Sequence, residues 1–130
     1  MLDADVLIAD ERGVFDLGRW LGAQTDDGFE LAAITAAELW HGLETASAQH
    51  RARRQAYIEA ALAFCSVIPY TILTAKTHAR LWALLESSGQ MIGYHDLIVA
   101  ATALERNIPV ATFNKRHFAA VPGLTVLTPF

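Results

Sequence analysis

The 130-residue sequence contains one cysteine, Cys65, which excludes an internal disulfide and a zinc site built on several cysteines. It has no uninterrupted apolar run long enough to span a bilayer. Its first residues, MLDADVLI, lack the basic residues that precede the apolar part of a secretory signal. These absences lead us to expect a cytoplasmic protein without membrane association.

Several common catalytic motifs are also missing. The sequence contains no Gly-rich phosphate-binding loop, no Gly-x-Ser-x-Gly elbow and no His-x-x-x-His pair. His50, His78 and His95 are isolated from one another along the chain. These absences argue against a P-loop enzyme, a serine hydrolase and a zinc protease, and they leave carboxylates as the main candidates for chemistry.

The composition is that of a folded, mildly acidic domain. Apolar residues make up 53% of the chain, charged residues 18%, and the net charge is −4. We therefore expect one domain over residues 1–130, with enough apolar surface left over for a partner or a homodimer. The negative charge argues against a general nucleic-acid binder but not against a metal nuclease, which gathers carboxylates at its site.

Two short basic clusters interrupt this acidic background. One is HRARR, residues 50–54, and the other is NKRH, residues 114–117. The first has two interpretations: a solvated helix face, which is the more ordinary one, or a surface that contacts phosphates through Arg51, Arg53 and Arg54.

Predicted strands and helices alternate along the chain. Such alternation indicates an α/β sandwich with a mainly parallel sheet. The predicted strands are the tail at Leu2–Asp3, Glu30–Ile34, Ser66–Ile68, Val110–Thr112 and Thr125–Leu127; the predicted helices are Val14–Ala23, Ala36–Thr45, Gln49–Phe64, Ala75–Ser87 and Leu97–Arg106.

Oxygen-bearing side chains follow several of these strands. In a parallel sheet, ligands bind beyond the carboxyl ends of the strands. Four segments of the chain carry candidates to such an edge: Asp3 with Asp5, Thr35 with Glu38, Asp96, and Asn114. Carboxylate and amide oxygens from several loops suit Mg²⁺ or Mn²⁺, which activate water for attack on phosphate.

Asp3 and Asp5 lie close together in sequence, but their relative orientation depends on the backbone. On an extended backbone the two side chains share a face, whereas a turn that starts at Ala4 is expected to separate them. A turn-forming role for Asp3 is the alternative to a role in metal binding.

Glu38 and Asp96 have structural alternatives of their own. The segment Thr35–Glu38 has the S/T-x-x-E pattern of a capping box, in which Glu38 would bond back to the Thr35 N–H. Asp96 stands before an apolar helical run and fits a helix N-cap. The Glu38–His41 spacing matches a di-iron ligand pair, but the chain has no second Glu-x-x-His and does not indicate a helix bundle.

Trp40, Leu43 and Trp82 lie in predicted helices at apolar positions. Aromatic residues at helical spacing favour the core over a groove for a partner protein, so we expect these three side chains to be buried.

Four blocks of the sequence, taken together, resemble a known family. LDADVLI, ITAAELWHGLETA, GYHDLIVAATAL and VATFNKRHFAAVPGL are similar, in this order, to the signature blocks of PIN-domain ribonucleases, and most of all to the VapC toxins of type II toxin–antitoxin modules. The resemblance covers nearly the whole chain. It implies a three-layer α/β/α sandwich, an Mg²⁺- or Mn²⁺-dependent endoribonuclease, an RNA substrate, a VapB-like antitoxin and a homodimer.

The resemblance also implies which residues form the site. The acids of the family fall on Asp3, Glu38 and Asp96 as metal ligands, and its fourth polar position falls on Asn114. His117, and Asp5 in the Asp3-Ala4-Asp5 sequence, fall on accessory positions. Phosphate contacts are then expected from four basic residues: Lys115, Arg116, Arg51 and Arg54.

This chain departs from the family pattern in ways that leave another function open. Asp5 stands where a hydroxyl residue is common, Asn114 is neutral, and only Met1 and Leu2 precede the first acid, which predicts a short first strand. The alternative function is a catalytically weak module that binds RNA or a protein. A phosphoacceptor receiver domain does not fit, because residues 48–58 offer no aspartate.

Overall fold

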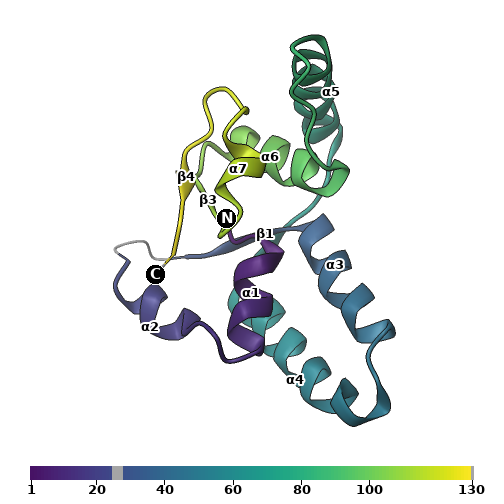
Figure 1. The fold of residues 1–130 in the computed structure, drawn as a ribbon, viewed down its shortest axis with the longest axis vertical. Coiled ribbons are helices and arrows are strands. Elements are labelled where there is room, and N and C mark those ends of the chain that lie inside the picture. The colour runs from purple at the N-terminus through teal and green to yellow at the C-terminus, as the bar shows by residue number, and fades with distance from the viewer. Residues whose placement is uncertain (25–27, 130) are drawn as a thin grey trace.

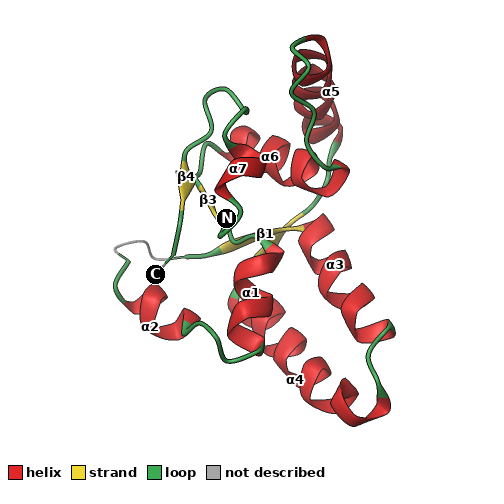
Figure 2. Cartoon of the chain, viewed as in Figure 1, coloured by secondary structure: helices red, strands yellow, loops and turns green. Residues whose placement is uncertain are grey.

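The computed structural model describes residues 1–24 and 28–129 as an α/β structure with helices on both faces of a small parallel sheet (Figure 1, Figure 2). The strands are β1 (Glu30–Ala32), β2 (Ser66–Ile68), β3 (Val110–Ala111) and β4 (Val126–Leu127). The helices are α1 (Ala4–Glu11), α2 (Leu17–Gly22), α3 (Ala33–Glu44), α4 (Ala48–Phe64), α5 (Ile72–Ser87), α6 (Tyr94–Arg106) and α7 (Lys115–Phe118).

The N-terminal segment lies in the middle of the molecule and joins two strand pairs, β1–β2 and β3–β4, each of them parallel (Figure 1). Leu2 forms an isolated parallel bridge with Ala111 of β3, and its N–H donates to the Glu30 carbonyl of β1 at 2.8 Å. The spatial order is therefore β2, β1, the N-terminal segment, β3 and β4. The predicted short first strand is confirmed, and it brings Asp3 to the edge where β3 ends.

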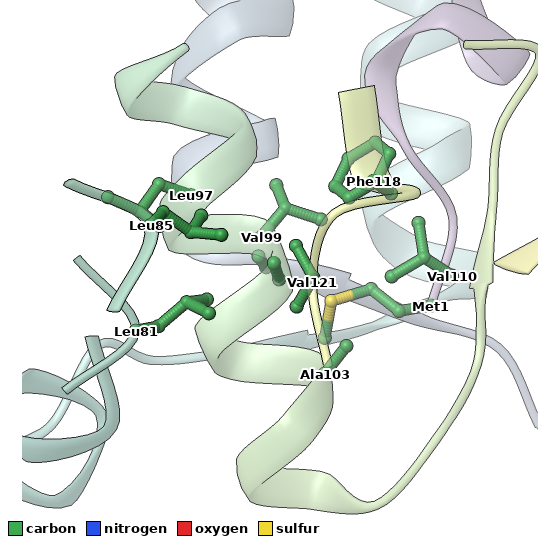
Figure 3. Packing of buried hydrophobic residues seen from close by; sticks show 11 residues of the cluster. Met1, Leu81, Leu85, Leu97, Val99, Ala103, Val110, Phe118 and Val121 are labelled. Atoms are coloured by element: carbon green, nitrogen blue, oxygen red, sulfur yellow. The ribbon is translucent and has the colours of Figure 1, made fainter. Parts of the chain in front are cut away.

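Two hydrophobic clusters cover opposite faces of this sheet. Alternate side chains of a strand point to opposite faces, and this separates Met1 from Leu2. One cluster joins the sheet to α5, α6 and α7 through Met1, Leu81, Leu85, Leu97, Val99, Val110 and Phe118 (Figure 3). The other joins it to α1, α3 and α4 through Leu2, Val6, Leu7, Leu31, Leu39, Leu43, Ile58 and Ala111. This arrangement confirms the predicted three-layer sandwich.

The element boundaries differ from the predictions mainly at helix starts. Strand β2 has the predicted bounds, and α4 begins one residue earlier than predicted. Helices α3, α5 and α6 each begin three residues earlier, so β1 ends at Ala32. Helix α2 begins three residues later than predicted, because the Asp16 side chain caps it by accepting the Arg19 N–H at 2.8 Å. Helices α1 and α7 were not predicted.

The prediction that both tryptophans lie in the core is wrong. Trp40 on α3 is 51% exposed and Trp82 on α5 is 42% exposed, whereas Leu43 is buried. Leu43 lies on the face of α3 that packs against α1 and α4. Trp40 lies on another face of α3, and Trp82 lies on a face of α5 that is turned away from the core. No helix among the described residues has the length and apolarity to cross a membrane.

Candidate active site

Asp3 and Asp5 meet at one buried hydroxyl group. The Thr112 Oγ1 lies 2.9 Å from Asp3 Oδ2 and 3.0 Å from Asp5 Oδ2. Asp3 caps α1 by accepting the Ala4 N–H at 2.9 Å, and Asp5 accepts the Phe113 N–H at 3.0 Å. The chain does turn into a helix at Ala4, but the expectation that this turn separates the two carboxylates is wrong. Both side chains project from the first turn of α1 toward the end of β3.

The hydrogen-bond count at Thr112 requires an extra proton. The hydroxyl carries one hydrogen and two acceptor sites, and the Asn114 N–H already occupies one of those sites at 3.0 Å. It therefore donates to one carboxylate only. The other carboxyl forms a hydrogen bond at this distance only when it is protonated itself. In the absence of a cation, Asp3 and Asp5 therefore hold one proton between them only below about pH 6, the pKa of Asp3.

The electrostatics of the two carboxyl groups agree with this proton count. Burial, and then the charge of Asp5, raise the pKa of Asp3 to about 6. Burial also raises the pKa of Asp5. Asp5 Oδ1 is buried and has no hydrogen-bond partner among the residues that the structure describes. A buried carboxylate oxygen without a partner is costly unless it binds a cation or a proton.

Asp96 lies in the first turn of α6, but it is not the N-cap. Gly93 is the N-cap, so the N-cap interpretation of Asp96 is wrong. Its Oδ2 lies within hydrogen-bond distance, 2.6 Å, of Nδ1 of His117. The Asn114 amide nitrogen lies 3.1 Å from the same Nδ1. The structure therefore groups Asp96, Asn114 and His117, and the charge of Asp96 is close enough to Asp3 to raise its pKa further.

Glu38 lies on α3 and bonds to a histidine instead of capping the helix. Its Oε1 is 2.9 Å from Nδ1 of His95, the residue before Asp96. The capping-box interpretation is wrong because α3 starts at Ala33, with Ala32 as N-cap, which places Thr35 inside the helix. Glu38 is thereby directed toward the start of α6.

These carboxylates have the right chemistry for a hard divalent cation, although they do not yet converge. Carboxylate oxygens are the ligands that Mg²⁺ and Mn²⁺ prefer. A cation nearby would stabilise the unbonded oxygen of Asp5 and the ionised form of Asp3, whose pKa is raised. Over residues 1–24 and 28–129, however, no three Asp, Glu, His or Cys side chains stand close enough to hold a metal ion as they lie. Glu38 and Asp96 each bond to a histidine through one oxygen, Oε1 and Oδ2 in turn, and keep the other oxygen for a cation, so metal binding requires that the side chains move closer together.

The arginines of α4 that were predicted to contact phosphates bond to the end of α3 instead. Arg51 donates to the Leu43 carbonyl at 3.0 Å and lies 3.4 Å from Glu44. Arg54 donates to the Gly42 carbonyl at 3.0 Å. These bonds satisfy carbonyls at the C-terminal end of α3. They give Arg51 and Arg54 a structural explanation, since they tie the start of α4 to the end of α3.

Two basic residues of α7, Lys115 and Arg116, have no such partners in the described part of the chain. Lys115 and Arg116 are exposed on the turn that follows Asn114, and neither forms an ion pair with any residue that the structure describes. They adjoin His117, which contacts Asp96. Of the predicted phosphate-binding residues, these two remain next to the carboxylates.

Two residues of this cluster were missed at the level of sequence. Thr112, which is completely buried and joins Asp3 to Asp5, directly follows strand β3, and a hydroxyl residue next to a strand end was the available signal. His95 was considered isolated. Its contact with Glu38 spans 57 positions of the chain and left no local pattern to find.

Comparison with known proteins gives one consistent result. Residues 1–124 match the PIN domain family. A protein named Ribonuclease VapC from Rickettsia bellii is 30% identical over 98% of this chain and 94% of its own length. Ribonuclease VapC10 from Mycobacterium tuberculosis is 34% identical over 95% of each chain.

A solved structure shares the fold as well. The DNA-bound VapBC complex from Salmonella typhimurium contains a chain that is 26% identical, with a TM-score of 0.89 over 98% of this chain and 96% of that one. The arrangement of the helices around the parallel strands is therefore the same in both. With a family match over most of its length and these relatives, this chain belongs to the PIN-domain family.

Proposed function

We propose that this chain is an Mg²⁺- or Mn²⁺-dependent endoribonuclease that acts in the cytoplasm as the toxin of a toxin–antitoxin module. The observation that carries the proposal is the buried pair of Asp3 and Asp5 on Thr112, in a chain whose relatives are named VapC ribonucleases. Two acidic groups that share a proton beneath an exposed edge are poised to exchange that proton for a cation.

The side chains of the candidate site have different roles in metal-dependent RNA cleavage. Asp3, Asp5, Asp96 and Glu38 provide the oxygen ligands, and Thr112 fixes the first two. When bound, the divalent ion supplies positive charge for the phosphate and an acidified water. Asn114 orients the water or a phosphate oxygen.

The RNA backbone is proposed to lie against α7. Lys115 and Arg116 are the exposed cations next to the carboxylates, and basic side chains position a nucleic acid through its phosphates. Each phosphate that they neutralise releases counterions, so RNA binding through α7 should weaken as salt increases.

A protein partner is proposed as well. Two similar solved structures are described in these terms: VapBC-5 from Mycobacterium tuberculosis as a member of the VapBC family of toxin–antitoxin systems, and a toxin–antitoxin complex from Klebsiella pneumoniae. In this chain, a cavity of about 110 Å³ between α1, α3 and α4 reaches Glu38. Its lining combines apolar side chains with charged Glu11 and Arg54, which suits a segment of a VapB-like antitoxin. Exposed apolar side chains elsewhere leave room for a homodimer.

The test is cleavage of a total RNA pool by the purified chain with Mg²⁺, with Mn²⁺ and with EDTA, beside Asp96→Asn. Glu86→Gln is the matched control, since Glu86 is an exposed carboxylate on α5 outside the site. We expect metal-dependent cleavage by the wild type and the control, and none by Asp96→Asn. A folded wild type that binds RNA or an antitoxin but cuts nothing with either metal would contradict the enzyme and favour a binding module.

A further inference from the structure

Phe113 is an exposed aromatic residue that is bonded directly to the candidate site. It stands between Thr112 and Asn114, and its own N–H donates to Oδ2 of Asp5 at 3.0 Å. The donating nitrogen is one bond, about 1.5 Å, from the Phe113 Cα. The main chain therefore holds this side chain beside a proposed metal ligand, whichever rotamer the side chain adopts.

The ring of Phe113 is fixed by a second ring. It meets the ring of Phe15 edge to face, with the centroids 5.2 Å apart and an angle of 84° between the planes. Phe15 is itself supported by Trp20, at 6.5 Å, and by the buried cluster that contains Leu2 and Val6. In an edge-to-face pair, at least one face of each ring stays outside the contact. Because Phe113 is 38% exposed, part of a fixed aromatic ring remains open to a ligand.

Phe113 and helix α7 belong to opposite faces of the sheet, and the carboxylates come from both. Phe118 of α7 is part of the buried cluster on the α6 side, whereas Phe15 packs against the cluster on the α1 side, where it contacts Phe113. Figure 1 shows the same division, with α7 and α1 on either side of the N-terminal segment. Asp96 comes from α6 and Asp5 from α1. A nucleic-acid strand that crosses the end of the sheet, from the basic residues of α7 to Phe113, therefore passes the carboxylates on its way.

We propose that Phe113 stacks on the base next to the scissile phosphate, on the side of that phosphate opposite to α7. This inference rests on the proposed ribonuclease function and deepens it: the basic residues of α7 contact phosphates, the carboxylates hold the metal ion, and Phe113 binds a base. Single-stranded RNA suits such a site, because its bases are free to leave the helical stack and to lie on an aromatic ring. One ring accepts every base, since each base has a π face. Phe113 therefore favours unpaired RNA without selecting one sequence.

Two other roles of Phe113 are separated from this one by the test below. In the first, the side chain only covers the apolar surface of Phe15, and its removal affects stability alone. In the second, it contacts the proposed antitoxin and has no part in RNA binding. The hydrogen bond from Phe113 to Asp5 favours the substrate, because it places the exposed ring where the nucleotides beside the scissile phosphate have to pass.

The test compares two short labelled strands by fluorescence anisotropy in EDTA, at fixed salt. One is a mixed-sequence oligoribonucleotide, and the other is an abasic strand with the same ribose-phosphate backbone. The variants are Phe113→Ala, which removes the ring, and Phe113→Trp, which replaces it by a larger one. Phe64→Ala is the matched control, because Phe64 is 65% exposed and stacks on Phe29, which precedes β1 at the end of the sheet opposite to the carboxylates.

The expected result is a loss that depends on the bases. Phe113→Ala should weaken binding of the normal strand by about 5-fold or more, the usual worth of one stacked base, and leave binding of the abasic strand unchanged. Phe113→Trp should bind the normal strand at least as tightly as the wild type, because an indole ring also stacks on bases. Phe64→Ala should match the wild type on both strands. Phe113→Leu, which keeps an apolar contact with Phe15 but has no ring, gives the same comparison if Phe113→Ala does not fold.

Two results would overturn the inference. The first is unchanged affinity of Phe113→Ala for the normal strand; a loss of stability or of antitoxin binding in that variant then identifies the role that the side chain has instead. The second is an equal loss on the normal and abasic strands, since a base is then not the ligand. Failure of the proposed function looks different, because the wild type itself then cuts no RNA with Mn²⁺. A wild type that cuts RNA, together with a Phe113→Ala variant that keeps the full preference for the normal strand, disproves the stacking alone.

Discussion

The two acidic pairs of the candidate site are held in opposite ways. Asp3 and Asp5 are held by hydrogen bonds from backbone N–H groups and by the buried hydroxyl of Thr112. Glu38 and Asp96 are instead held by two exposed histidines, His95 and His117 in turn. The first pair has its position before any cation arrives, whereas the second lies on partly exposed side chains that must move closer to the first. The contrast indicates that preorganisation resides at the end of β3 and adaptability in the side chains of α3 and α6.

The strongest test of the buried pair is Thr112→Val. This change keeps the shape of the side chain but leaves two carboxyl groups and the Asn114 N–H without their shared partner. We expect metal-dependent cleavage to fall by about 100-fold or more, as when one preorganised polar group is lost from an active site. The free energy of unfolding should drop by about 2 kcal/mol, because buried polar groups lose their hydrogen bonds.

Thr112→Ser is the control for that experiment, since it keeps the hydroxyl. Cleavage should stay within a few-fold of wild type in this variant. Equal activity of the valine and serine variants, measured on the same RNA pool, would show that the hydroxyl does not organise the carboxylates.

The shared proton is tested by Asp3→Asn. The unfolded chain releases the Asp3 proton near pH 3.8 and the folded chain near pH 6, so the wild type loses stability relative to this variant as the pH rises through that window. Above pH 6 the metal-free variant should be more stable by about 3 kcal/mol. Asparagine also caps helices well, so α1 keeps its start.

Thermal or urea unfolding in EDTA at pH 4 and pH 7.5 measures this difference. The stability gain should be present at pH 7.5 and largely absent at pH 4. A variant that is less stable than wild type at pH 7.5 would argue against a buried, proton-sharing pair. With Mn²⁺ added the order should reverse, because the wild type then gains the free energy of metal binding.

The basic residues show the same contrast, because some of them bond to other parts of the fold and others are exposed to solvent. Arg54→Ala should lower the free energy of unfolding by about 1 kcal/mol through its lost bond to the Gly42 carbonyl, with little effect on RNA affinity. Lys115→Ala should do the reverse and also reduce the salt dependence of RNA binding. A large loss of RNA affinity in Arg54→Ala, without a loss of stability, would return α4 to the RNA surface.

The smallest expected effect concerns the exposed pair. In His117→Ala, Asp96 no longer shares its carboxylate with a histidine when it binds metal, so the affinity for Mn²⁺ should increase by about 2- to 5-fold, the worth of one exposed polar contact. His95→Ala should act in the same direction through Glu38. Isothermal titration measures both. Weaker Mn²⁺ binding in either variant would instead make that histidine a ligand.

Much of the fold could be predicted from the sequence because it depends on local patterns of apolar residues. The strand at Ser66–Ile68 and the helix of α4 follow from their apolar patterns and are confirmed. Helix α1 was missed because the apolar residues of LDADVLI also fit a strand, and only the capping Asp3 indicated a helix. Helix α7 has four residues, too few to carry a helical period.

The candidate residues of the site could be predicted from the sequence, but the groups to which they hydrogen-bond could not. Asp3, Glu38, Asp96 and Asn114 stand out as polar groups near strand ends or helix starts. Which group holds each of them depends on contacts between distant segments, such as Thr112 with Asp3, 109 positions apart. The arginines of α4 show the same limit, because a basic run looks alike whether it faces RNA or caps a neighbouring helix.

The most direct test of this account is a Mn²⁺ titration of the metal-free chain by calorimetry, in two buffers with different ionisation enthalpies, for wild type and Asp96→Asn. At pH 6 the account predicts that wild type binds Mn²⁺ and releases protons from the buried pair, and that less is released at pH 8. It also predicts that Asp96→Asn binds far more weakly. A wild type that binds no Mn²⁺, or an Asp96→Asn variant that binds it equally well, would contradict the account.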